Sequence, residues 1–313
     1  MNIDLYRLSD RGDWNDFVSQ AKNSHFMFHR DYMEYHAERF IDFSIMARNN
    51  KGEVIGILPA NLSNRTLHSH QGLSFGGLCV RKNVTTSMVL DVFNSIISFL
   101  KSTNLVDDFI YKRLPDIYTN YPSQEDLYAL FKVGAELYRR DVSVAIDLHQ
   151  PLPMSSMRKR HVKKAVKNNV LFGEEENLSE FWNLLTEVLQ SQHGVGPVHS
   201  LSEINKLRHS FPESIRCFSA RKEGIVIAGT LVFETADVVH TQYLANGLLG
   251  RELRGLDLVI SELIEKYSNT KKYFSFGIST EEGGNVLNEG LISQKEDFGA
   301  RAQVHDFFRL NLA

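Results

Sequence analysis

IMARNNKGEVIGIL (45–58) and CFSARKEGIVIAGTL (217–231) are two versions of one pattern, and they give the clearest indication of the fold. Each contains an apolar strand ending in Ala-Arg, a polar turn with glycine, and an apolar partner strand with a central glycine. Turn residues that tolerate positive φ between two apolar runs are typical of a β-hairpin. The sequence therefore predicts one hairpin of the same kind in each half of the chain.

The elements around the two hairpins also correspond. In the first half, the spacing of apolar residues predicts strands at 3–8, 42–48, 53–62, 72–80, 106–114 and 136–148, and helices at 13–21, 29–40, 85–100 and 124–133. In the second half it predicts helices at 157–169, 178–192, 254–267 and 286–295, and strands at 215–220, 225–234, 238–246, 272–277 and 303–310. Each half follows the order hairpin, strand, helix, strand, helix, strand. We therefore expect an α/β fold with mixed α+β sheets, built from two tandem modules related by duplication.

The segment HQPLPMSS (149–156) separates the halves, because it has two prolines and no periodicity. We place the boundary near Pro151, with one module at 1–150 and the other at 151–313. A chain of 313 residues also suits two domains of roughly 150 residues each.

Charge and cysteine content exclude several classes of protein. With 35 basic and 38 acidic side chains the formal net charge is −3, so DNA is not an expected partner and any anion site must be local. Cys79 and Cys217 are the only cysteines, too few for a disulfide framework and spaced unlike a zinc ligand set, which favours a reducing cytoplasm and implies no structural metal. No stretch approaches the roughly 18 apolar residues of a membrane span, so we expect a cytoplasmic protein without an integral membrane segment.

Motifs of several enzyme classes are absent. The sequence contains no P-loop, no G-x-G-x-x-G after a strand, no H-E-x-x-H and no G-x-S-x-G. The pairs His25/His29 and His68/His70 come without a third obvious metal ligand. We therefore expect no bound metal and no tightly bound cofactor.

The densest charge cluster is MRKRHVKKAVKNN (157–169), which has six Lys or Arg residues, including Arg158, and no acid. Its cationic face could bind phosphates, or it could be a solvated helix surface; the sequence leaves both open.

A glycine-containing turn, GLLGRELRGLDL (247–258), joins a strand to a helix. Arg251, Arg254 and Gly255 could form an anion cradle there, because the N–H groups at a helix start and arginine side chains attract phosphate. Glycine connections before helices are also common without a ligand.

The polar stretch YFSFGISTEEGGNVLNEGLISQKEDFG (273–299) follows directly on a strand end. Glu281 or Glu282 could be a general base, and Ser279 and Thr280 could orient an acceptor; alternatively these side chains cap the next helix.

Together these segments resemble the FemAB/FemX-like branch of the GNAT acyltransferase superfamily, whose members carry tandem GNAT modules. The resemblance is carried by VVHTQYLAN (238–246), by FSFGIST (274–280), and by Lys295 with Phe298-Gly299, which is similar to the K-x-x-F-G signature of that branch. The basic helix at 158–170, ending in Asn-Val, also matches the pattern.

The resemblance implies transfer of an acyl or aminoacyl group to an amine without a covalent enzyme intermediate. It implies acyl-CoA as co-substrate and a small amine acceptor, such as a nucleotide-linked sugar or another cell-envelope precursor. Lys295 and Arg158 would then contact substrate, His240 could be the base, and Tyr243 could protonate the leaving thiolate. From strand alternation, either Tyr243 with Thr241 or His240 with Gln242 would line the site.

One departure from the pattern concerns the donor. CoA-using GNAT modules typically have Q/R-x-x-G-x-G/A at the pyrophosphate loop, whereas residues 251–256 read Arg-Glu-Leu-Arg-Gly-Leu, with Arg254 in place of the first glycine. An aminoacyl-tRNA-dependent peptidoglycan-type ligase is therefore an alternative, and tRNA is the less favoured partner because no long heptad run provides a coiled-coil arm. A catalytically silent module that binds a glycan precursor is the third possibility.

Overall fold

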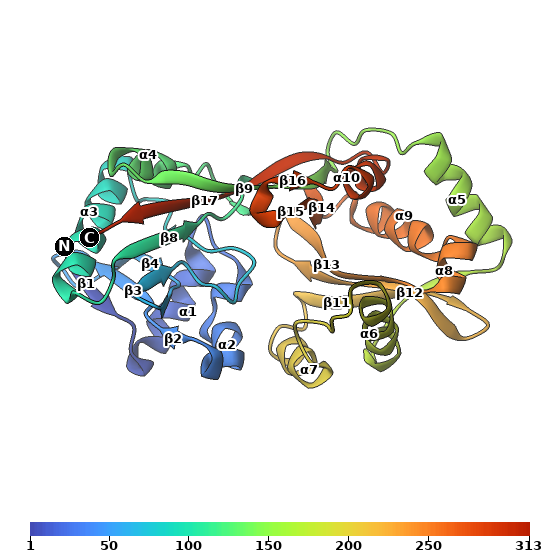
Figure 1. Ribbon diagram of the computed structural model, residues 1–313, viewed down its shortest axis with the longest axis horizontal. Coiled ribbons are helices and arrows are strands. Elements are labelled where there is room, and N and C mark those ends of the chain that lie inside the picture. The colour runs from blue at the N-terminus through green and yellow to red at the C-terminus, as the bar shows by residue number, and fades with distance from the viewer. The chain divides into compact units, whose positions relative to one another are not determined.

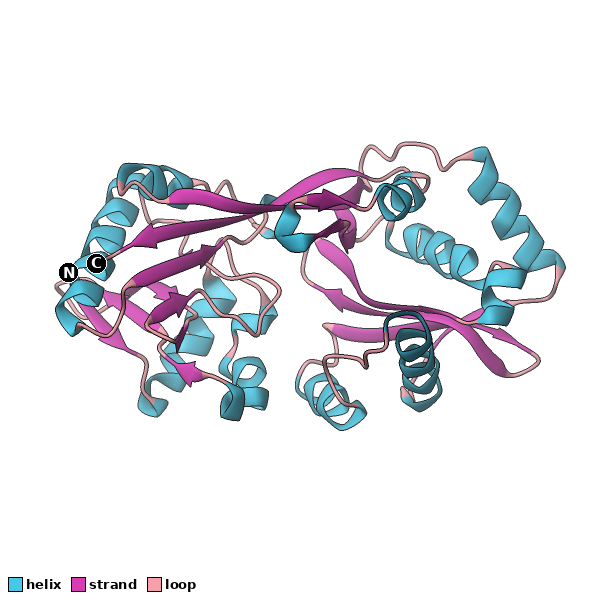
Figure 2. Cartoon of the chain, in the orientation of Figure 1, coloured by secondary structure: helices cyan, strands magenta, loops and turns pink.

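The computed structural model describes all residues from 1 to 313, and they divide into two units (Figure 1). Unit 1 consists of Met1–Asp141, Glu282–Asn285 and Val304–Ala313; unit 2 consists of Val142–Glu281 and Val286–Gln303. Both units combine helices with strands (Figure 2), as the sequence predicts for an α/β fold with mixed sheets. No helix in the chain combines the length and the apolar character needed to cross a membrane.

Unit 1 contains an antiparallel sheet and a second group of strands. The sheet has the order β1 (Asn2–Leu5), β3 (Ile45–Arg48), β4 (Val54–Leu58), β7 (Cys79–Val80). The second group has the order β17 (Arg301–Asn311), β8 (Asp108–Lys112), β6 (Thr66–His68), β5 (Asn61–Ser63), β2 (Ile41–Asp42). The helices are α1 (Arg11–Gln20), α2 (Arg30–Met33), α3 (Thr86–Thr103) and α4 (Glu125–Lys132). The apolar face of α3 packs into the core that β3, β4 and β8 share, as its periodicity predicts.

Four predicted elements of unit 1 are wrong in extent. The strand predicted at 42–48 is broken into β2 and β3, and that predicted at 53–62 into β4 and β5; in each case the two parts belong to different groups of strands. The strand predicted at 72–80 exists only at Cys79–Val80, because Gly76 lies so close to the Ser69 carbonyl that a Cβ would be 1.7 Å from its oxygen, and Gly77 has a φ of +97°. The helix predicted at 29–40 is interrupted after α2 and continues as a 3₁₀ helix, in which His36 has the non-helical angles φ −128° and ψ 28°. β6 was not predicted; it pairs with β5 through a turn in which Asn64 and Arg65 both have positive φ, as in a type I′ hairpin.

Unit 2 is built on a six-stranded sheet whose strands are antiparallel except for one parallel pair. The order is β10 (Leu171–Glu174), β11 (Ile215–Lys222), β12 (Ile225–Glu234), β13 (Val238–Asn246), β14 (Tyr273–Ile278), β9 (Glu136–Asp147, in unit 2 from Val142). Helices α5 (Ser156–Lys167) and α9 (Gly255–Tyr267) lie on one side of β11–β13, and α6 (Ser179–His193) and α7 (Leu201–Ser210) lie on the other (Figure 1). Two shorter helices are α8 (Leu248–Leu253) and α10 (Glu289–Glu296). The buried faces of β11–β14, α5 and α9 form one apolar core.

The parallel pair in this sheet is short. β13 and β14 are paired only from Val238 with Tyr273 to His240 with Ser275, and beyond this point the two strands separate. On its other side β13 carries a β-bulge, because Leu231 pairs with Tyr243 and Val232 with Thr241, which leaves Gln242 without a partner on β12. The second half of β13 therefore has a sheet neighbour on one side only.

In unit 2 the elements β10, α7 and α8 were not predicted, and the other differences from the sequence concern the module boundary and the last helix. The loop between β9 and α5 contains Pro151, whereas the units change at Val142 and most of β17 returns to unit 1. The boundary at 150/151 stays a prediction. Val286–Leu287 does not begin a helix but forms β16, which pairs with β15 (Thr280–Glu281), and α10 begins only at Glu289, where the Asn288 side chain caps it.

Both cysteines are buried, and burial raises the pKa of each thiol.

Two strand glycines of unit 2 provide a matched test of this packing. In Gly229→Ala the new Cβ would lie 2.8 Å from the Phe218 carbonyl oxygen and 2.9 Å from the Phe181 ring, so we expect a loss of about 1–3 kcal/mol in unfolding free energy. Gly173→Ala, also in a strand, meets nothing within 4 Å and should leave stability almost unchanged. Urea denaturation of the two variants beside the wild type measures both values; equal stabilities would contradict the close approach of β12 to α6.

Candidate functional site

A cavity lined by several charged side chains lies in unit 2, where β13 and β14 separate. Its volume is about 740 Å³, and its walls come from α5, the end of α6, α8, α9, α10 and the C-terminal halves of both strands. Leu244, Ile260, Phe276 and Phe298 provide apolar surface. The separation of the two strands thus leaves a lined pocket instead of a continuous sheet.

Two arginines and a helix start lie at this pocket. Arg251 and Arg254 line it, and α9 begins at Gly255 directly after Arg254. Arg254 has left-handed angles, φ 65° and ψ 36°, and it gives α9 no side-chain cap. Its Nε is buried without a hydrogen-bond partner. Because the first N–H groups of a helix have no partner within it and the helix dipole is positive there, the arrangement suits a phosphate group.

Lys295 closes another part of the same pocket. Its Nζ donates hydrogen bonds to the carbonyl oxygens of Gly277 (3.1 Å) and Ile278 (2.7 Å) and to Ser279 Oγ (2.9 Å). No carboxylate forms an ion pair with Lys295, and burial lowers its pKa to about 8. The two predicted substrate-binding residues Lys295 and Ser279 are therefore in direct contact, and together they fasten α10 to the end of β14.

A buried carboxylate joins α5 to α9 in the pocket wall. Asp257, which is 6% exposed, accepts a hydrogen bond from Arg158 Nη1 at 2.6 Å, and its Oδ1 lies 3.2 Å from His161 Nδ1. Arg158 also donates to the Gln294 carbonyl oxygen (3.2 Å) and lies over the ring of Phe298. The structure thus places the predicted Arg158 in the pocket, with its charge shared with Asp257.

Sequence reasoning missed Asp257 and did not assign His161 to the site. The available signal was the spacing of three between Arg158 and His161, which puts both on one face of the helix. Nothing local indicates that Asp257, nearly 100 residues further along, meets them.

His240 and Tyr243 do not line this pocket. The bulge at Gln242 adds one residue, so the alternation of side chains shifts and His240 and Tyr243 face the same side of β13, which the sequence analysis did not foresee. His240 Nδ1 lies 3.0 Å from Ser275 Oγ, and the Tyr243 hydroxyl lies 2.5 Å from His199 Nδ1. Leu244 and Asn246 are the β13 residues that line the pocket. The catalytic roles of His240 and Tyr243 stay predictions.

The loop residues Thr280 and Glu281 lie in β15, outside the pocket lining. Thr280 Oγ1 accepts a hydrogen bond from the backbone N–H of Val142 (3.3 Å), and Glu281 Oε1 accepts one from Asn288 Nδ2 (2.7 Å). In this structure both stabilise the loop before α10, and their predicted functional roles stay predictions.

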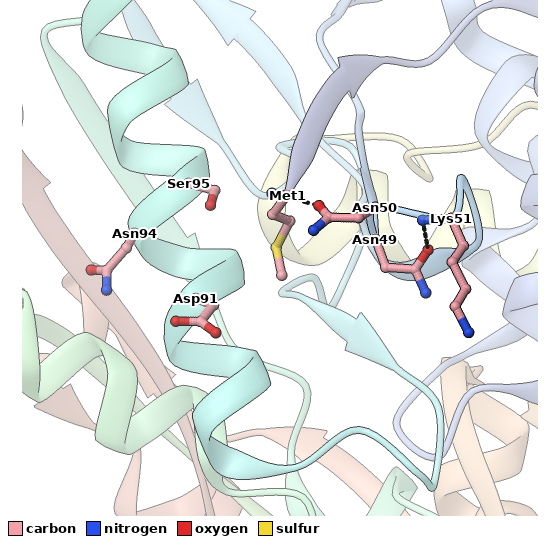
Figure 3. Close-up of a pocket in the computed structure, with 7 residues that line it drawn as sticks. All are labelled: Met1, Asn49, Asn50, Lys51, Asp91, Asn94 and Ser95. Carbon is pink, nitrogen blue, oxygen red and sulfur yellow. Dashed lines mark hydrogen bonds between the residues drawn. The ribbon is translucent and has the colours of Figure 1, made fainter.

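Unit 1 has a cavity of about 600 Å³ between α3, the N-terminus and the β3–β4 turn (Figure 3). Seven residues line it: Met1, Asn49, Asn50, Lys51, Asp91, Asn94 and Ser95. Its ionisable side chains, Lys51 and Asp91, are exposed to solvent, so burial strengthens the electrostatic interactions of neither one. No group of three or more His, Cys, Asp or Glu side chains in the chain is arranged to hold a metal ion. The unit 2 pocket is therefore the candidate site.

Comparison with solved structures shows a FemAB/GNAT-like fold, which confirms the expected tandem architecture. The crystal structure of FemX matches with a TM-score of 0.70 and 11% identity, covering 99% of this chain and 97% of that chain. The structure of L-PGS from Bacillus licheniformis matches with a TM-score of 0.61 and 10% identity, covering 96% and 91%. A tandem GNAT protein from the clavulanic acid biosynthesis pathway matches with a TM-score of 0.51 and 11% identity, covering 100% and 99%. No protein-family profile and no curated protein matches the sequence. At these identities the shared property is the fold.

The buried amine of Lys295 predicts a pH dependence of stability. Its folded pKa of about 8 lies below the ordinary value of 10.5, so between these pH values the unfolded chain binds more protons and folding becomes more favourable as pH rises. Lys295→Met lacks this group. We expect the unfolding free energy of the wild type to increase relative to that of Lys295→Met between pH 8 and 10.5, as measured by urea denaturation. Lys159→Met, at an exposed position of α5, is the control; parallel pH profiles for wild type and Lys295→Met would contradict the desolvated amine.

Proposed function

We propose that the protein is an N-acyltransferase that moves an acyl group from acyl-CoA to an amino group of a nucleotide-linked sugar or cell-envelope precursor. The observation that carries this proposal is the pocket at the separation of β13 and β14, with Arg251, Arg254 and the uncapped start of α9 in its wall. A long, partly apolar carrier with phosphates needs both parts of this pocket, the apolar lining and the anion site.

The geometry of Arg254 bears on the donor. Glycine is typical at this position of a CoA-binding loop because it adopts positive φ without strain. Here Arg254 itself has a φ of 65°, so the turn into α9 keeps a left-handed residue although the glycine is absent. The Arg254 guanidinium adds a positive charge to the anion site. Arginine in place of the usual glycine is therefore compatible with a phosphate-bearing donor.

The proposed reaction needs no covalent intermediate. The lone pair of the acceptor nitrogen attacks the thioester carbonyl carbon, the C–S bond breaks, and one proton passes from nitrogen to the leaving thiolate. His161 is the only histidine of the pocket, and Asp257 orients its ring, so we assign it the removal of the amine proton. Lys295 supplies positive charge in a desolvated wall, where it acts more strongly on an anionic group than in water.

The acceptor class rests on the proteins that share the fold. Two proteins with the same fold are FemX and L-PGS, and a related C-terminal domain is that of a lysylphosphatidylglycerol synthetase from Agrobacterium fabrum, with a TM-score of 0.63 and 10% identity. Their names favour an acceptor in the cell envelope.

Titration calorimetry with CoA and with acetyl-CoA, at low and high salt, tests the donor. Micromolar binding that weakens with salt would support the proposal, because local cations are screened by ions. Absence of binding up to millimolar concentration would instead favour an aminoacyl-tRNA donor. Binding without turnover on any amine acceptor would favour a silent binding module.

Arg254→Gly separates binding from stability. The substitution removes the guanidinium and relieves the left-handed backbone, so we expect CoA affinity to fall about tenfold or more while stability is unchanged or slightly higher. Asn104→Gly is the matched control, because Asn104 also has left-handed angles (φ 54°) but lies at the C-terminus of α3 in unit 1. Calorimetry and thermal unfolding measure the two quantities. Unchanged affinity in Arg254→Gly would remove Arg254 from the donor site.

A further inference from the structure

One end of the unit 2 sheet collects exposed apolar side chains. β10 begins at Leu171, β12 begins at Ile225, and β11 and β13 end at Lys222 and Asn246. Because β10 to β13 are antiparallel neighbours, these four termini lie at the same end of the sheet. We call this region the hairpin end and define it by Leu171, Ile225 and Leu248.

These three residues are unusually exposed for large aliphatic side chains. Leu171 is 70% exposed, Ile225 65% and Leu248, at the start of α8, 84%. Val166 in the last turn of α5 is 57% exposed and precedes Leu171 by five residues. Single exposed apolar residues are ordinary, but three at one end of a sheet, with Val166 on the helix that leads into it, indicate a surface that is covered in function.

The adjoining face of α5 is cationic and unpaired. The five exposed cations of α5 are Lys159, Arg160, Lys163, Lys164 and Lys167. None of them forms an ion pair in the structure, and the spacing of four within Lys159/Lys163/Lys167 places like charges next to one another, which costs helix stability. Figure 1 shows the end of α5, α8 and the β11–β12 hairpin together at one end of unit 2.

We propose that the hairpin end and the cationic face of α5 dock unit 2 on an anionic phospholipid surface. The cations complement the charge of the lipid headgroups, and Leu171, Ile225 and Leu248 enter the boundary between headgroups and acyl chains. An RNA would use the cations alone. None of the exposed large apolar side chains of unit 2 is aromatic, so the surface lacks the rings on which bases stack.

Co-sedimentation of the full chain with vesicles tests the docking. We expect binding to equimolar phosphatidylcholine and phosphatidylglycerol, and none to phosphatidylcholine alone. The variant Lys163→Ala/Lys164→Ala/Lys167→Ala should bind anionic vesicles about a hundredfold more weakly, because each lysine removed lowers the affinity by a factor of about ten or less. The variant Leu171→Thr/Ile225→Thr/Leu248→Ser should lose roughly tenfold, because its side chains no longer enter the interface.

Leu8→Ser/Phe131→Ser is the matched control, since these unit 1 residues are 73% and 75% exposed but lie outside the proposed surface. Circular dichroism and CoA calorimetry without vesicles establish that each variant is folded, and they report on the proposed donor site independently of docking. Wild type that ignores anionic vesicles would overturn the inference. Normal binding of anionic vesicles by the aliphatic variant would also overturn it. If, in addition, the wild type binds bulk tRNA and the lysine variant does not, the surface would be assigned to RNA.

Discussion

The short pairing of β13 with β14 is the constraint on which the candidate site depends. Three residues of each strand form the parallel ladder, and then the strands separate, which frees backbone groups that a sheet would have paired. Lys295 satisfies two of them, because its Nζ binds the carbonyl oxygens of Gly277 and Ile278. One buried amine therefore binds the end of β14 where the two strands have separated, and the absence of a carboxylate partner leaves its positive charge in the wall.

The electrostatics of the pocket follow from the same arrangement. The whole chain has a formal charge of −3, yet Arg158, Arg251, Arg254 and Lys295 line one cavity and Asp257 is the only acid among the lining residues. Asp257 offsets Arg158, and in doing so it fixes α5 against α9 and orients His161. The remaining cations make this pocket locally positive, so attraction of an anionic carrier does not require a basic protein.

The sequence predicts what is local and fails where distant segments meet. The two hairpins, α5, α6, α9 and the strands beside them follow from apolar spacing and turn residues. Residue types and neighbours predict Arg251, Arg254 and Arg158 as anion contacts, whereas Lys295 is predicted only by resemblance to the FemAB/FemX-like branch. All four line the pocket, and their roles stay predictions. The bulge at Gln242 has no signature in VVHTQYLAN, so the faces of His240 and Tyr243 could not be assigned. Asp257 was missed because its partners lie on another helix.

The two units differ in how the helix that follows their third hairpin-side strand begins, α3 in unit 1 and α9 in unit 2. In unit 1, α3 follows strand β7 and is capped by Thr85, whose side chain accepts a hydrogen bond from the Met88 N–H; no cation lies in its first turn. In unit 2, α9 has no side-chain cap. It begins directly after Arg254, which lines the pocket. A side-chain cap occupies an N–H group that a phosphate would otherwise use. The start of α3 thus has one N–H group bound by its own cap, whereas no side-chain cap occupies the start of α9.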